Sequence, residues 1–175
     1  INKNVYGGGN YGVTGTANGN GTAKLATAST IDILGGIVKD SVYGGANSNG
    51  TVTNAQTIKG STVINMKNGT VEGTIYGGCN SSGTVSGATD INITGGTIDA
   101  TVGIRRSSNY LKTSPKTIYN MYGTVNISGG NIKSNASYTI MNSNVNGNSV
   151  VNVMGGEILF NAGGVLNHNL YWYSM

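Results

Sequence analysis

An eight-residue pattern occurs five times in this chain of 175 residues, and it constrains the fold more than any other feature. It reads apolar, Asn or Asp, apolar, any residue, Gly or Asn, Gly, any residue, apolar. The copies are Ile31–Val38, Ile64–Val71, Ile91–Ile98, Val125–Ile132 and Val151–Ile158, so they begin 26 to 34 residues apart. Five copies at nearly constant spacing predict a repeat architecture.

A second motif, apolar-Tyr-Gly-Gly-small-Asn, follows the first at a fixed distance. Its copies are Val5–Asn10, Val42–Asn47 and Ile75–Asn80. Val42 and Ile75 lie six residues after the second glycine of the preceding pattern, and the same offset in the later repeats reaches Val102, Ala136 and Ala162. Each unit is therefore expected to contain a strand, a Gly-Gly turn, a second strand, a glycine-rich corner and a connection of variable length.

Apolar residues alternate with polar ones inside each unit, as in Ile31, Ile33 and Ile64, Met66. A period of two with β-branched residues predicts strands. A two-sheet sandwich also has short alternating strands, but it does not repeat one motif at a near-constant phase. We therefore predict an all-β chain, a right-handed parallel β-helix of about five to six coils with corner insertions of variable length. Residues 1–175 form one domain of it, expected to be part of a longer repeat protein.

Composition supports this reading and excludes several others. Gly, Asn, Thr and Ser fill 91 of the 175 positions, and only 9% of residues are charged. Such a chain is too poor in helix-forming residues for a helical bundle, and a single Cys cannot make a disulfide scaffold. No apolar run approaches the roughly 18 residues of a membrane span. Disorder is the main rival, but Val and Ile recur at 31 ordered positions.

Aligning the repeats predicts columns of like residues on adjacent coils. Side-chain amides in register can hydrogen-bond along the stacking direction, aromatic rings can stack, and opposite charges can pair. The predicted amide ladder is Asp32, Asn65, Asn92, Asn126 and Asn152. The predicted ring column is Tyr6, Tyr43 and Tyr76, and the charge column is Lys39, Glu72, Asp99, Lys133 and Leu159. The predicted inward column is Ile33, Met66, Ile93, Ile127 and Val153.

These motifs resemble the repeats of large bacterial and archaeal surface proteins. The resemblance lies in the Gly-Gly-x-Ile/Val turns, the Tyr-Gly-Gly-x-Asn corners and the connections Gly50-Thr51-Val52 and Gly83-Thr84-Val85. Such surface proteins include adhesin-like proteins and autotransporter-type passengers that have a pectin-lyase-like β-helix. The resemblance implies a fold but no single activity, because that fold carries lyases, adhesins, tailspikes and structural stalks.

The residues do not predict a catalytic centre, a cofactor or a metal site. The acidic residues are Asp32, Asp40, Glu72, Asp90, Asp99 and Glu157, and no three of them converge in the alignment. His168 has no second His for a triad or a zinc site. Cys79 occupies a small-residue slot, which suits a buried thiol. Phosphate-loop endings are missing after the glycine-rich corners.

The repeat is interrupted between residues 104 and 122, and we expect ligand contacts there. This segment holds four of the ten basic residues and the only proline of the chain. The candidate ligand-binding residues are Arg105, Arg106, Tyr110, Lys112, Lys116 and Tyr119. Cations beside aromatic rings suit an acidic glycan better than nucleic acid. The plain alternative is a solvated loop that projects from the side of the body.

The sequence thus favours a non-enzymatic, extracellular, surface-exposed β-helix that serves as an adhesin or a structural stalk. Acidic glycans or a neighbouring cell surface are the expected partners, with no nucleic acid and no membrane span. One alternative is a segment of a polysaccharide lyase or hydrolase whose catalytic residues lie elsewhere. Another is a subunit that associates end to end into a filament, because open strand edges invite pairing.

Overall fold

A computed structural model describes residues 1–8, 27–47, 57–79, 84–85, 87–99, 116–121, 123–134, 138–143, 150–160 and 165–168. These residues form strands, turns and bends, with no helix among them. Every pairing between the strands is parallel. The predictions of an all-β chain and of parallel strands are therefore confirmed.

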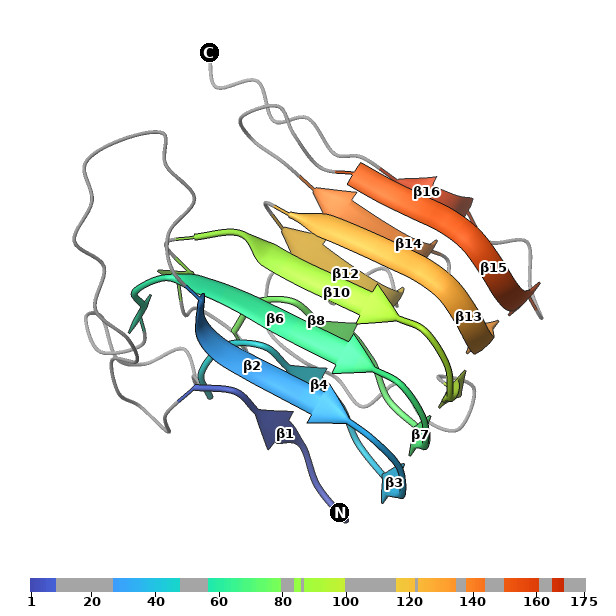
Figure 1. The fold of residues 1–175 in the computed structure, drawn as a ribbon, viewed down its shortest axis with the longest axis horizontal. Coiled ribbons are helices and arrows are strands. Elements are labelled where there is room, and N and C mark those ends of the chain that lie inside the picture. The colour runs from blue at the N-terminus through green and yellow to red at the C-terminus, as the bar shows by residue number, and fades with distance from the viewer. Residues whose placement is uncertain are drawn as a thin grey trace.

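The strands form three sheets, shown in Figure 1. The eight-stranded sheet contains, in order, β2 (Thr27–Ile33), β6 (Ser61–Met66), β10 (Thr89–Ile93), β13 (Thr124–Ser134), β11 (Thr97–Asp99), β7 (Thr70–Val71) and β3 (Ile37–Val38), with β15 (Val150–Phe160) paired to β13. The six-stranded sheet contains β1 (Val5–Tyr6), β4 (Val42–Tyr43), β8 (Ile75–Tyr76), β12 (Lys116–Met121), β14 (Tyr138–Ser143) and β16 (Val165–His168). The two-stranded sheet contains β5 (Thr57–Ile58) and β9 (Thr84–Val85).

The larger sheet curls, because the chain turns at one glycine in each repeat and the short strand after the turn pairs with the same strand of the neighbouring repeat. β13 runs through this turn and joins the two arms of the sheet. In Figure 1 the strands β2, β6, β10, β13 and β15 lie side by side in chain order, with the six-stranded sheet as a second layer. The molecule is thus layered, and each repeat contacts the repeats before and after it.

The five copies of the eight-residue pattern are in register, as their alignment predicts. Ile31 pairs with Ile64, Ile64 with Ile91, and Ile91 with Val125. Val125 in turn pairs with Val151. Connections of very different length therefore return the chain to the same place in each repeat.

A glycine in the left-handed region makes the turn in all five repeats. The φ angles are +77° at Gly36, +87° at Gly69, +81° at Gly96, +84° at Gly130 and +89° at Gly156. The turn is also crowded, since a Cβ added to Gly96 would lie 2.8 Å from the carbonyl oxygen of Gly69. That oxygen accepts a 2.8 Å hydrogen bond from the Thr97 N–H. Positive φ therefore favours glycine in every turn, and at Gly96 the space requires it as well.

Branched aliphatic side chains fill the space between the layers. The fully buried side chains include Val42, Ile58, Ile64, Met66, Ile75, Ile91, Ile93, Ile98, Ile127, Ile132 and Ile140. Most of them come from the alternating positions that the sequence places inward. At about 25 cal/mol per Å² of apolar surface removed from water, this burial is the main stabilising contribution.

The five residues of the inward column pair in register, but the last of them is not buried. Ile33, Met66, Ile93 and Ile127 are at most 7% exposed, whereas Val153 is 47% exposed. Val153 lies on β15, whose only partner strand among the described residues is β13. Its side chain is covered from one side, while Ile127 has a neighbouring strand on both sides.

The six-residue offset to the corner is also wrong beyond the second repeat. Ile75 pairs with Ile118 of β12, so Ile118 holds the corner position expected at Val102. Ile118 pairs with Ile140, and Ile140 with Asn167, in place of the expected Ala136 and Ala162. Longer connections are tolerated because the entropy of closing a loop grows slowly with its length.

A buried row of hydroxyl groups links the two main sheets, and it is not among the columns predicted from the repeated pattern. Ser29 Oγ donates a 2.9 Å hydrogen bond to the Gly44 carbonyl, and Thr62 Oγ1 donates one of 2.6 Å to the Gly77 carbonyl. Thr89 is the next member of the row and is 1% exposed. The signal is a Ser or Thr two residues before the first apolar residue of the pattern.

Candidate functional site

A continuous row of hydrogen-bonded amides crosses the outer face of the larger sheet. Asn65 Nδ2 donates to Asp32 Oδ1 at 2.8 Å, and Asn92 Nδ2 to Asn65 Oδ1 at 2.9 Å. Asn126 Nδ2 donates to Asn92 Oδ1 and Asn152 Nδ2 to Asn126 Oδ1, both at 2.8 Å. The structure therefore brings all five residues of the expected ladder together.

This row has a direction, because every bond runs from the later repeat to the earlier one. Asp32 stands at the first position, and as a carboxylate it only accepts. Asn152 stands at the last position, where its Nδ2 donates to Asn126. Among the described residues, none donates to Asn152 Oδ1.

Three tyrosine rings form a second row at the corner of the six-stranded sheet. The ring centroids of Tyr6 and Tyr43 are 5.0 Å apart, and those of Tyr43 and Tyr76 are 4.6 Å apart. The rings are almost parallel, with interplanar angles of 11° and 5°. Asn4 Nδ2 donates to the Tyr6 hydroxyl at 3.1 Å. Tyr43 is buried between the other two, so the row is a packed wall and not an open binding surface.

The expected charge column is present as two ion pairs. Lys39 Nζ lies 2.8 Å from Glu72 Oε1, and Lys133 Nζ lies 3.7 Å from Asp99 Oδ2. The lysine side chains are 51% and 44% exposed, so each pair contributes at most about 1 kcal/mol. Their main effect is on register, because a shift of one residue would separate the partners.

The structure describes only the last part of the expected side insertion. Arg105, Arg106, Tyr110 and Lys112 lie outside the described residues. Lys116 and Tyr119 belong to β12, and the backbone of Tyr119 pairs with that of Tyr76. The prediction that the whole segment 104–122 projects from the body is therefore wrong for 116–121, which lie within the six-stranded sheet. The Ile118-Tyr119 pair could have revealed this, since it repeats the Ile75-Tyr76 corner without its glycines.

Cys79 is held in a close-packed corner. Its Sγ accepts a 3.3 Å hydrogen bond from the Ala46 N–H, and a Cβ on Gly45 would meet the same sulfur at 2.5 Å. Burial raises the pKa of the Cys79 thiol, opposed by the weaker effect of the Ala46 hydrogen bond. The group is therefore a protonated thiol at neutral pH, which disfavours nucleophilic chemistry.

The acidic side chains mostly have structural partners within the fold. Asp40 Oδ1 accepts from the Ser41 N–H and Asp90 Oδ1 from the Thr124 N–H, each at 3.1 Å. Within the described part of the chain, no three His, Cys, Asp or Glu side chains gather in a group that could hold a metal ion. The same residues include no helix long and apolar enough to cross a membrane.

Comparison with protein-family models, with curated proteins and with solved structures found no match to this chain. The resemblance to surface-protein repeats therefore depends on the sequence motifs alone. The candidate functional features are the outer amide row and the basic residues that precede β12 in the sequence.

Proposed function

We propose that the chain is a right-handed parallel β-helix and acts as an extracellular, surface-exposed stalk or adhesin without enzymatic activity. One observation supports this proposal above the others: the five-membered amide row keeps its register although the connections between its members differ in length. A β-helix reproduces one cross-section in every coil, and a row of this kind requires that. Parallel crossover connections are right-handed in nearly all proteins.

The geometry suits a load-bearing or displaying role. Each repeat is bonded to the next by backbone ladders, side-chain amides and packed aliphatic rows, so the body resists bending along its stacking direction. The amide row runs along the described outer face, and Lys39 and Lys133 are paired with Glu72 and Asp99. A rigid body of repeated strands is a good support for variable segments that contact a partner.

The partner that the chemistry favours is an acidic glycan or a cell surface that carries one. The net charge is +4 and the isoelectric point is near 9.2. Arg105 and Arg106 would contact acidic groups, and Tyr110 would stack on a sugar ring. Lys112 belongs to the same proposed contact segment, whereas Lys116 and Tyr119 lie in β12 and are left out of it.

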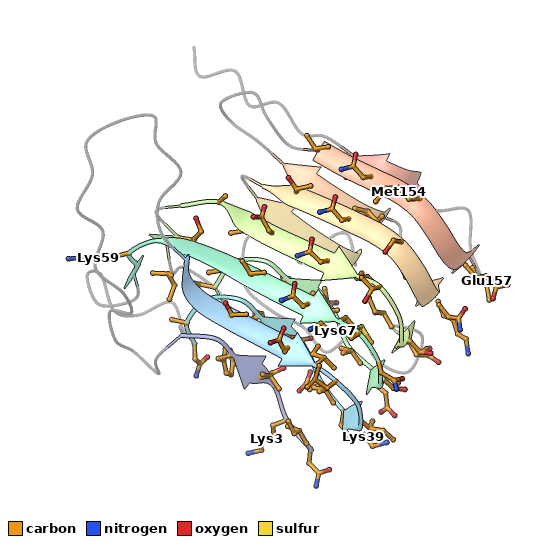
Figure 2. All side chains as sticks on the ribbon, in the orientation of Figure 1. Lys3, Lys39, Lys59, Lys67, Met154 and Glu157 are labelled. Carbon is orange, nitrogen blue, oxygen red and sulfur yellow. The ribbon has the colours of Figure 1, made fainter. Side chains whose placement is uncertain are left out.

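The test removes two arginines and compares the variant with an equal loss of charge elsewhere. We expect Arg105→Ala with Arg106→Ala to weaken retention on acidic glycans at least fivefold at low salt, and less at high salt because the charges are screened. The matched control is Lys59→Ala with Lys67→Ala, two exposed lysines of the regular repeats (Figure 2). Immobilised glycans and circular dichroism provide the measurements.

Four outcomes separate the readings. Weaker retention in the arginine variant alone supports the adhesin. Equal losses in both variants mean that net charge, and not this segment, is responsible, and unchanged retention in both leaves the plain stalk as the better reading. Release of shorter oligosaccharides by the unaltered chain would instead favour the polysaccharide-active alternative.

A further inference from the structure

The turn of the second repeat differs from the other four turns at its first residue. The other repeats have a glycine pair there, whereas the second has Asn68 followed by Gly69. In the next two repeats the position of Asn68 is filled by Gly95 and Gly129, where an added Cβ would overlap a carbonyl oxygen of the preceding repeat. Among the described residues this is the only Asn-Gly pair. Departures from a regular pattern are where a special role is expected.

The side chain of Asn68 contacts the backbone of its own turn. Asn68 Oδ1 accepts a 2.8 Å hydrogen bond from the Gly69 N–H. Because a C=O bond is about 1.23 Å long, the amide carbon Cγ of Asn68 lies about 3–4 Å from the Gly69 nitrogen. Reacting atoms that are held ready for attack are about 3–3.5 Å apart. The side-chain amide and the next backbone nitrogen are therefore close enough to react.

Solvent reaches this pair of residues. Asn68 and the preceding Lys67 are exposed, and Gly69 is half-buried. Figure 2 shows Lys67 at the end of β6, where the turn begins. Gly69 has no side chain that would hinder an approach to its nitrogen. Water and hydroxide can therefore take part in a reaction of this amide.

We propose that Asn68 is a site of spontaneous deamidation through a cyclic imide formed with Gly69. Hydroxide removes the proton of the Gly69 N–H, and the nitrogen attacks Asn68 Cγ. A bond forms between this nitrogen and Cγ, the bond from Cγ to Nδ2 breaks, and ammonia leaves. Water then opens the imide at either carbonyl, which leaves aspartate or isoaspartate at position 68. One water is consumed and one ammonia is released, without an oxidant or an enzyme.

The asparagines of the amide row are protected from the same reaction. Asn92 Nδ2 donates to Asn65 Oδ1, and Asn92 Oδ1 accepts from Asn126 Nδ2. Neighbouring repeats hold both polar atoms of this amide, so it does not turn towards the next backbone nitrogen. That nitrogen belongs to Ile93, which is 1% exposed and lies in a paired strand. The fold thus leaves one amide reactive beside a row of inert ones.

The products change a turn that is bonded to the first repeat on both sides of the reacting pair. The Asn68 N–H donates to the Ile33 carbonyl at 3.2 Å, and the Thr70 N–H donates to the Gly36 carbonyl at 2.8 Å. Isoaspartate lengthens the backbone between these two anchors by one carbon, because the chain then runs through Cβ and Cγ. We therefore expect isoaspartate at position 68 to lower the stability of the fold. The reaction does not depend on glycan binding.

Ageing of the intact chain tests the proposal. The unaltered protein is kept for weeks at mildly alkaline pH in water enriched in heavy oxygen, and peptide mapping by mass spectrometry follows each asparagine. We expect position 68 to lose its amide about tenfold faster than Asn92 or more, since two hydrogen bonds of Asn92 must break first. Both aspartate and isoaspartate should appear, each with one heavy oxygen. The other Asn-Gly pairs of the sequence lie outside the described residues and are followed separately.

Two results of the mapping would overturn the proposal. Aspartate without isoaspartate at position 68 would mean direct hydrolysis of the amide and no cyclic imide. Equal rates at Asn68 and Asn92, or no loss at either, would mean that the turn does not favour the reaction. The rate at Asn68 should also rise with pH, because the attacking nitrogen must lose its proton, and a rate independent of pH would contradict the cyclic route.

Asn68→Gly is the matched control, because it restores the glycine pair of the other four repeats. It has no side-chain amide at this position, so ageing should leave its turn unchanged. Thermal unfolding compares fresh and aged samples of both proteins. We expect the unaltered chain to lose stability as isoaspartate accumulates at position 68, and Asn68→Gly to lose less. Equal losses in the two proteins would overturn the effect assigned to this turn.

Discussion

β13 and β15 contain the same eight-residue pattern, yet they differ in how well they bury it. Ile127 on β13 is fully buried, whereas its partner Val153 on β15 is 47% exposed. Val125 is fully buried as well, while Val151 is only partly so. The difference comes from the neighbours: β13 has strands on both sides, and β15 has one on a single side among the described residues. The pattern sets the direction of a side chain, and the adjacent repeats set its burial.

The first repeat differs from the last, because its inward residue Ile33 is only 7% exposed. Its exposed apolar residues are Leu34 (64%) and Ile37 (48%), at positions where the second repeat has Lys67 and Thr70. Among the described residues, exposed large apolar side chains thus occur in the first and last repeats. Unfolding is expected to be cooperative, because each middle repeat is stabilised by contacts with the repeats on both sides of it.

The largest contrast is expected from an aspartate placed in the inward column. Ile93→Asp would bury a charge with no partner, and it should lower the free energy of unfolding by about 4 kcal/mol or more. Val153→Asp is the matched change at the exposed end and should cost about 1 kcal/mol or less. Thermal unfolding at low protein concentration measures both. Equal losses would contradict the difference in burial between the middle and the end.

The hydroxyl row offers a second contrast of intermediate size. Thr62→Val keeps the shape of the side chain but leaves the Gly77 carbonyl without its 2.6 Å hydrogen bond inside the protein. We expect a loss of about 1–3 kcal/mol. Thr70→Val, on the partly exposed strand β7, should change stability by less than about 0.5 kcal/mol. Urea unfolding of the two variants decides this, and a Thr62→Val variant as stable as the parent would show that the carbonyl finds another donor.

The smallest contrast is expected along the amide row. Asn92 both donates and accepts within the row, whereas Asn152 only donates. Since one hydrogen bond contributes about 0.5–1.5 kcal/mol, Asn92→Ala should cost about twice as much as Asn152→Ala. Chemical unfolding with several replicates can resolve this difference. The reverse order would mean that the row is not stronger in the middle than at its end.

The columns could be predicted from the sequence because aligning the copies of the repeated pattern is enough to place their residues side by side. Asn65, Asn92 and Asn126 fall beside one another as soon as the patterns are aligned, and so do the turn glycines. The corner of the third repeat could not be predicted in this way. Its strand begins after a long connection, and nothing in the offset from Gly96 distinguishes Val102 from Ile118.

Burial and buried polar bonds were harder to predict for a different reason. The exposure of Val153 depends on which strand lies beside it, and that is not a property of its own repeat. The bond from Thr62 to Gly77 joins two sheets across the interior, so it follows from the three-dimensional path of the chain. Of the candidate ligand residues, Tyr119 could be placed by its Ile-Tyr pair, whereas Arg105 and Arg106 have no counterpart in the regular repeats.

The glycine turns have a consequence for how such a molecule can change in size. The carbonyl oxygen of the turn glycine accepts a backbone hydrogen bond from the next repeat. The Thr70 N–H donates to Gly36 and the Thr97 N–H donates to Gly69, both at 2.8 Å. A tandem duplication of residues 62–88 would therefore meet compatible surfaces above and below. It would add one layer of about 4.8 Å. The reach of the molecule can thus grow in steps of one strand spacing, while its cross-section stays the same.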